Sequence, residues 1–145
     1  MRKYRLLLAI ITAIASLPHA YAGLGDQESR VLTVHSKALL THQGLYNQIS
    51  YSTGDGVNLH EYSDLVQHRV FALSWSGSRP YPLSAVVDSD ALKTALAQRH
   101  RVDHHAMTLQ VGNTVIESRV YLRSYFGRAW QPQNLPEGVT PGSLP

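Results

Sequence analysis

The sequence predicts an α+β domain: a small antiparallel sheet of about five strands with one helix packed on a face, preceded by a signal peptide. Three observations support this prediction. Apolar residues alternate with period two in several short segments. Glycine-containing turns separate two pairs of these segments. One stretch between the groups of strands has helical periodicity instead, which is typical of a helix that covers a sheet.

The first 22 residues have the three-part layout of a secretory signal peptide. A basic start precedes an apolar run over residues 6–17, and Ala20-Tyr21-Ala22 is the small-x-small pattern of a cleavage site. A membrane-spanning helix needs about 20 apolar residues, and this run is shorter. We therefore expect cleavage after Ala22, a periplasmic or secreted product, and no transmembrane span after cleavage.

Removal of this peptide changes the charge of the chain. The full sequence has 13 Lys and Arg against 10 Asp and Glu, a formal net charge of +3. Arg2, Lys3 and Arg5 lie in the peptide, so the mature chain is formally neutral. A nucleic-acid partner requires a basic surface, and we expect none. The chain has no cysteine, which excludes disulfides, a lipid-modified cysteine and thiol chemistry.

The first half of the mature chain is expected to be mainly β-structure. Residues 23–43 allow a short helix capped by Ser29, with a strand over 30–34 as the alternative. Residues 45–53 and 57–62 alternate on either side of Gly54-Asp55-Gly56, which predicts a hairpin. Residues 69–76 are apolar on both faces, which indicates a central strand.

The second half begins with a proline-containing linker and a helix. We expect the linker over residues 77–82 and the helix over 84–99, with Asp88 or Ser89 as its N-cap. Residues 106–111 and 114–126 then predict two strands around a turn at Gly112-Asn113. The predicted divisions are a signal peptide (1–22), one α+β domain (23–130) and a Pro/Gly-rich tail (131–145), non-regular and at most partly ordered.

Several motifs together resemble a known family. They are the run from Gly56-Val57 to Glu61-Tyr62, then Val70-Phe71-Ala72-Leu73-Ser74-Trp75-Ser76-Gly77, then Tyr125-Phe126-Gly127-Arg128-Ala129-Trp130-Gln131-Pro132, and Leu135-Pro136-Glu137-Gly138-Val139. This chain resembles the exported proteobacterial proteins of domain of unknown function 2844. The resemblance covers most of the mature chain and implies a periplasmic or secreted domain with no activity attached. The family usually has a glycine between the Glu-Tyr and Val-Phe strands, where this chain has residues 64–68.

A stripe of arginine and tyrosine is the candidate binding site. If residues 114–126 form one strand, Arg119, Tyr121, Arg123 and Tyr125 share one face with Glu117, and Arg128 follows closely. Arginine and tyrosine are common in recognition surfaces because each offers a flat contact and a polar group. The expected partner is an envelope protein or an anionic or carbohydrate ligand. The alternative is an outer face on which the arginines pair with Glu117 and neighbouring acids.

Histidines supply a second, weaker hypothesis. In a helix, His100 and His104 would lie one turn apart, and Asp103 could add an oxygen ligand to a metal. Arg101 stands where a zinc-protease helix has its glutamate, and Arg99 and Arg101 repel a dication. Solvated surface histidines, or a pH-sensitive cluster, are the alternative interpretations. We expect no cofactor.

Enzyme motifs are largely missing. The sequence has no Gly-x-Ser-x-Gly elbow and no phosphate-binding glycine loop. Ser74 or Ser76 could form a catalytic pair with His60, but the sequence alone does not establish the geometry that such a pair needs. We therefore expect an exported, non-enzymatic domain that binds a ligand or supports an envelope assembly. The alternatives are an envelope hydrolase or metal-dependent enzyme using the histidines, and a periplasmic metal-binding protein.

Overall fold

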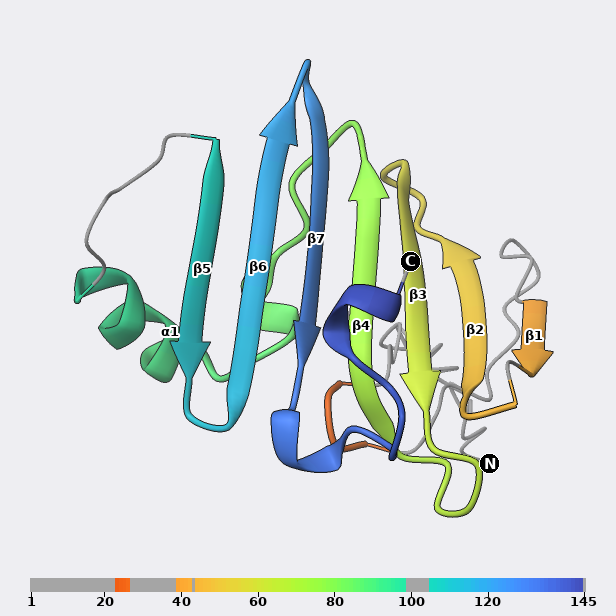
Figure 1. The fold of residues 1–145 in the computed structure, drawn as a ribbon. Coiled ribbons are helices and arrows are strands. Elements are labelled where there is room, and N and C mark those ends of the chain that lie inside the picture. Colours follow the sequence, from red (N-terminus) through yellow and green to blue (C-terminus); the bar gives the residue numbers. More distant parts are fainter. Residues whose placement is uncertain (1–22, 27–38, 43, 99–104, 145) are drawn as a thin grey trace, which may run out of the picture.

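The computed structural model describes residues 23–26, 39–42, 44–98 and 105–144. This part of the chain forms one antiparallel sheet, one α-helix and three short 3-10 turns (Figure 1). The strands are β1 (Leu39–His42), β2 (Asn47–Ser52), β3 (Val57–Ser63), β4 (Val70–Gly77), β5 (Ala106–Val111), β6 (Thr114–Tyr121) and β7 (Ser124–Trp130); the helix is α1 (Ser89–Ala97), and the turns are η1 (Leu83–Ala85), η2 (Pro132–Asn134) and η3 (Pro141–Ser143).

Two antiparallel meanders make up the sheet. The first runs through β1 to β4, and the second through β5 to β7. They join where β7 pairs with β4, which gives the order β1-β2-β3-β4-β7-β6-β5. β4 is thus the central strand, and its residues from Val70 to Trp75 are all buried. The predicted α+β class, the central strand and the two glycine-turn hairpins are confirmed.

The strand count was predicted too low. Six strands, β2 to β7, form the main sheet in place of about five, and the short β1 adds to one edge. The long strand predicted over residues 114–126 is wrong. The chain reverses at Leu122 and Arg123, and β6 pairs with β7 from Val115↔Trp130 to Tyr121↔Ser124. Leu122 and Arg123 both have left-handed backbones, with φ of 46° and 65°.

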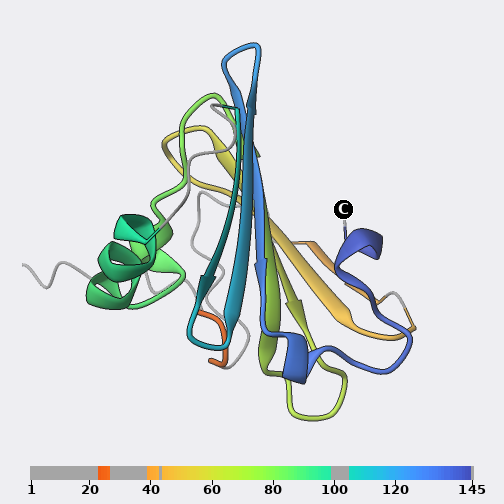
Figure 2. The ribbon, with the colours of Figure 1, turned by 60° about the vertical axis from the view of Figure 1, so that its left-hand side comes forward.

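The helix is shorter than the predicted span. It begins after Asp88, whose side chain accepts hydrogen bonds from the backbone N–H groups of Asp90 and Ala91, so the predicted cap is confirmed. Residues 83–85 form η1 instead of the first helical turn. Leu92 is buried and Leu96 is 42 % exposed, so the apolar stripe that contacts the sheet is narrow. In consequence, α1 covers only the β5 end of its face (Figure 2).

Each face of the sheet carries its own apolar cluster. On the α1 face, Trp75, Leu59 and Ile116 are central members of the cluster. A Cβ at Gly127 would overlap the Trp75 indole, so this position requires glycine. Gly127 therefore allows β7 to pack closely against Trp75 of the neighbouring strand β4.

The opposite face is covered by the C-terminal residues. Tyr62, Phe71 and Trp130 form its cluster with Val139 and Leu144, both of which are buried. The proline-rich segment is non-regular as predicted, apart from η2 and η3, but it packs across the sheet (Figure 2). We call this side of the sheet the tail face.

The β3–β4 turn adopts a conformation that usually needs glycine. His68 has φ of 55°, in the segment where the family resemblance implies a glycine. The Asp64 carboxylate accepts hydrogen bonds from the backbone N–H groups of Val66, Gln67 and Arg69. Burial alone would raise the pKa of Asp64. These hydrogen bonds together lower it by more, so the net shift of the pKa is downward. A carboxylate thus organises a turn that lacks glycine.

Candidate functional site

A row of polar side chains crosses the tail face of the sheet. Residues directly opposite each other on antiparallel strands point to the same face, so the strand register defines the row. The pairs Ser50↔His60, His60↔Ser74, Ser74↔Arg128 and Arg128↔Glu117 link strands β2, β3, β4, β7 and β6. We call Ser50, His60, Ser74, Arg128 and Glu117 the polar row.

His60 is held by its neighbours on β2. The Ser50 hydroxyl oxygen lies 2.6 Å from His60 Nδ1, and the Gln48 amide nitrogen lies 3.3 Å from the same atom. Because an amide nitrogen can only donate, His60 Nδ1 acts as the acceptor and the neutral ring carries its proton on Nε2. Burial lowers the pKa of His60 from its ordinary value. A neutral imidazole therefore faces the site near pH 7.

Ser74 is held from the opposite direction. Its hydroxyl lies 3.0 Å from the Tyr62 phenol oxygen. Burial, only partly offset by this hydrogen bond, raises the pKa of Tyr62 to about 12. Tyr62 thus remains protonated, and it fixes Ser74 within the row.

Arg128 connects the row to the tail. Its Nε and Nη2 atoms lie 2.8 and 2.7 Å from Glu117 Oε2, and its Nη1 atom donates to the carbonyl of Pro141 at 2.5 Å. The guanidinium also lies 5.5 Å from the centre of the Trp130 ring. About a third of each side chain of the Arg128–Glu117 pair is exposed, so the pair positions the tail more than it stabilises the fold.

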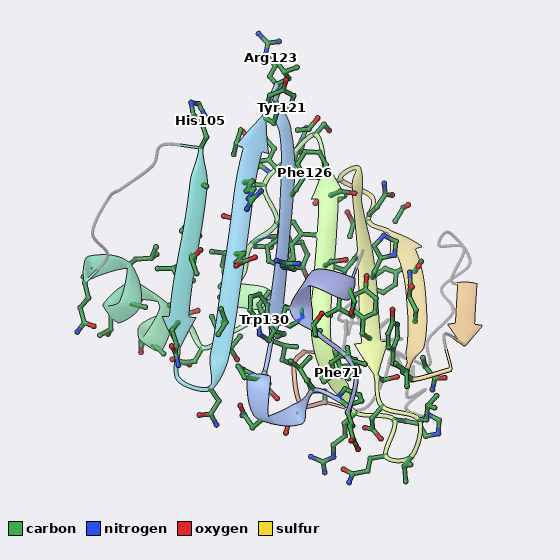
Figure 3. All side chains as sticks on the ribbon, viewed as in Figure 1. Phe71, His105, Tyr121, Arg123, Phe126 and Trp130 are labelled. Carbon is green, nitrogen blue, oxygen red and sulfur yellow. The ribbon has the colours of Figure 1, made fainter. Side chains whose placement is uncertain are left out.

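A pocket of about 320 Å³ opens over this row. Arg119 and Phe126, which are paired on β6 and β7, line it on the side of the β6–β7 hairpin, and Leu144 of the tail lines it on another side. Figure 3 shows Phe126 between the hairpin tip, where Tyr121 and Arg123 lie, and Trp130. The lining of the whole pocket comprises His60, Ser74, Trp75, Ser76, Glu117, Ser118, Arg119, Phe126, Gly127, Arg128 and Leu144.

The charges in the pocket do not cancel. Arg128 is paired with Glu117, and His60 is neutral near pH 7. Arg119 is exposed and takes part in no salt bridge with the residues that the structure describes. The pocket therefore carries one net positive charge.

A second hollow of about 690 Å³, between Thr53–Val57 and Arg79–Ala85, has no comparable row of hydrogen-bonding groups.

The predicted arginine–tyrosine stripe is divided by the hairpin. Arg119, Tyr121 and Arg128 share the tail face, because Arg119 pairs with Phe126, Tyr121 with Ser124, and Arg128 with Glu117. Arg123 lies in the turn itself. Tyr125 pairs with Val120 on the opposite face, so its predicted place in the stripe is wrong. The alternative in which an arginine pairs with Glu117 is correct for Arg128.

The metal hypothesis falls on His100, Asp103 and His104, which lie outside the described residues. Among the residues that are described, no group of three or more His, Asp or Glu side chains is placed to hold a metal ion. The histidine that lines the pocket is His60. The sequence analysis considered it only as a partner of Ser74 or Ser76, with no geometry to support the pairing.

The polar row does not have the order of a serine hydrolase relay. His60 and Ser74 are adjacent, but Ser74 pairs with Tyr62 and His60 Nδ1 with Ser50. Glu117 lies three strand spacings from His60, about 14 Å, and it pairs with Arg128. A carboxylate at that distance cannot orient the imidazole by direct contact. The arrangement is suited to binding through hydroxyl, imidazole and guanidinium groups.

The fold and pocket define a small antiparallel-sheet domain with a polar, weakly cationic site on one face. A family model described as "Protein of unknown function (DUF2844)" matches residues 20–144, and the chain belongs to this family. Comparison with curated proteins and with solved structures gave no match. Within the described residues, no helix is both long enough and apolar enough to cross a membrane.

Proposed function

We propose that this protein is an exported, non-enzymatic domain that binds an anionic saccharide in the pocket over the polar row. The observation that carries the proposal is the combination of a row of hydrogen-bonding groups with an arginine outside any described salt bridge. Pockets of roughly 300–1,000 Å³ are typical of small-ligand sites, and this one is at the lower end.

The chemistry of the lining supports a sugar with a carboxylate, sulfate or phosphate group. Sugar hydroxyls both donate and accept hydrogen bonds, as do the serine hydroxyls of the lining, and the neutral imidazole of His60 can donate from Nε2. The Phe126 ring, 45 % exposed, offers an apolar surface for the C–H face of a sugar ring. Arg119 can form charge-assisted hydrogen bonds to the anionic group.

Export is part of the proposal and rests on the sequence. The basic start, the apolar run and the Ala20-Tyr21-Ala22 pattern support cleavage after Ala22 and a periplasmic or secreted location. N-terminal sequencing of the protein recovered from the cell envelope would test cleavage, and an intact Met1 there would contradict it.

The test of binding is a glycan array that carries uronic-acid, sulfated and phosphorylated saccharides, probed with the purified protein. We expect selective capture of anionic saccharides. Arg119→Ser should weaken it about tenfold to a hundredfold, since a hydrogen bond to a charged group is lost. Arg79→Ser is the matched control, because Arg79 is also exposed and lies outside the pocket.

Two results would contradict this proposal. One is equal capture of neutral and anionic saccharides or capture of neither, and the other is equal capture by the wild type and Arg119→Ser. Hydrolysis of an arrayed saccharide, abolished by His60→Gln, would instead support the enzymatic alternative.

A further inference from the structure

The tip of the β6–β7 hairpin extends beyond the rest of the sheet (Figures 1 and 2). On one side the β4 pairing ends at Tyr125, and on the other the β5 pairing ends at Arg119. Within the described part of the chain, Val120 still donates a backbone hydrogen bond to the carbonyl of His105, and residues 121–124 pair only with each other. They form a convex projection at one end of the sheet, with Tyr121 and Arg123 at its extremity (Figure 3).

Apolar side chains are exposed on this projection. Leu122 is 80 % exposed and Tyr121 is 70 % exposed, and Val120 is exposed as well. Phe126, just outside the projection where β7 pairs with β4, is also exposed. Leu122 and Arg123 both hold left-handed backbones that asparagine and glycine adopt more easily. The turn therefore carries an unfavourable backbone and an exposed leucine together. Neither stabilises the isolated fold, which is typical of a segment kept for contact with a partner.

The charges at the tip have one sign. Residues 118–126 contain Arg119 and Arg123 and no acidic residue. The nearest carboxylate along β6, that of Glu117, is already paired with Arg128. Apolar and aromatic side chains beside arginines are typical of segments that lie in the headgroup region of a bilayer, where the arginines meet lipid phosphates.

We propose that the β6–β7 tip inserts Tyr121 and Leu122 into the headgroup region of an anionic lipid bilayer. A bilayer interface can close around a convex tip of this kind. Arg119 and Arg123 match the negative surface charge of such a bilayer. Arg119 also lines the saccharide pocket, whereas Leu122 and Arg123 do not, so variants at these two residues test this proposal separately from the proposed function.

Flotation of the purified protein with vesicles provides the test. We expect binding to vesicles that contain phosphatidylglycerol and much weaker binding to phosphatidylcholine alone. Leu122→Ser and Arg123→Ser should each reduce binding to the phosphatidylglycerol vesicles about fivefold to tenfold. Val66→Ser is the matched control, since Val66 is 87 % exposed in another turn, and it should bind as the wild type does.

A gain-of-signal variant tests insertion directly. Trp75 and Trp130 are buried, so Leu122→Trp would place the one exposed indole of the described residues at the tip. Its fluorescence should shift to shorter wavelength and be quenched by brominated phosphatidylglycerol. Absence of vesicle binding by the wild type, or equal binding by Leu122→Ser and Arg123→Ser, would overturn the proposal. So would a change of oligomeric state in these variants without a change in vesicle binding.

Discussion

At the residue scale, the register of the sheet determines which side chains form hydrogen bonds with His60. Ser50 and Ser74 lie directly opposite it on the two neighbouring strands, and Gln48 supplies a second donor to Nδ1. A shift of one residue in either pairing would turn these partners to the other face. The site therefore depends on pairings between strands as well as on the residues themselves.

The titration of His60 follows from its burial. Its pKa in the folded protein lies below the ordinary value of 6.5, so the unfolded chain binds more protons just below that pH. The contribution of His60 to the free energy of unfolding is full at higher pH and decreases as the pH falls below 6.5. An NMR pH titration should give an imidazole pKa below 6.5 for the resonance that disappears in His60→Gln.

The same variant supplies the control for stability. If His60 acts as described, the unfolding free energy of His60→Gln should depend less on pH between about 6.5 and 5 than that of the wild type. A His60 resonance that titrates at or above 6.5 would contradict a buried neutral imidazole.

At the element scale, the turn of the β6–β7 hairpin lowers the stability of the fold, because Leu122 and Arg123 both have left-handed backbones. A left-handed conformation costs an ordinary L-residue about 1–2 kcal/mol, whereas Asn-Gly fits such a turn with little strain. The double variant Leu122→Asn, Arg123→Gly should therefore raise the free energy of unfolding by about 1–2 kcal/mol in urea titration. Unchanged or lower stability would show that the Leu-Arg turn is not strained. The same variant should bind anionic vesicles less well.

This turn also explains where prediction from sequence succeeds and fails. Gly54-Asp55-Gly56 and Gly112-Asn113 are recognisable turn sequences, and both hairpins were predicted. Leu122-Arg123 lies within an unbroken alternation, so nothing local distinguishes a turn from a continued strand. The missed turn placed Tyr125 on the wrong face and hid the pairing of Arg119 with Phe126. Arg119 and Arg128 nevertheless both line the pocket, because β6 keeps the predicted alternation as far as Tyr121 and Arg128 lies opposite Glu117.

At the scale of the whole molecule, the tail completes both the fold and the pocket. Val139 and Leu144 bury the second apolar cluster, and Leu144 lines the pocket. The proline-rich composition predicts a segment that is at most partly ordered. Composition does not reveal the surface on the sheet against which this segment packs. Arg128 provides part of that surface through the carbonyl of Pro141.

Truncation after Gln131 should accordingly destabilise the protein. Exposure of the sites of Val139 and Leu144 would cost about 3–6 kcal/mol, by the usual value for burying two such side chains. Urea titration measures the loss. If the truncated chain does not fold, Leu144→Ala in the full chain should cost about 2–5 kcal/mol. A loss below about 1 kcal/mol in either variant would show that the tail is not part of the core.

The pairing of β4 with β7 has a kinetic consequence. It brings Ala72 opposite Trp130, which are far apart in the sequence, so we expect the centre of the sheet to close after the local hairpins have formed. Until then, β4 presents an unpaired hydrogen-bonding edge, although its residues from Val70 to Trp75 are buried in the finished sheet. Such an edge can pair with another copy and aggregate. Slow long-range closure is expected from this topology, and the half-assembled sheet is the stage at which the chain most needs protection from its neighbours.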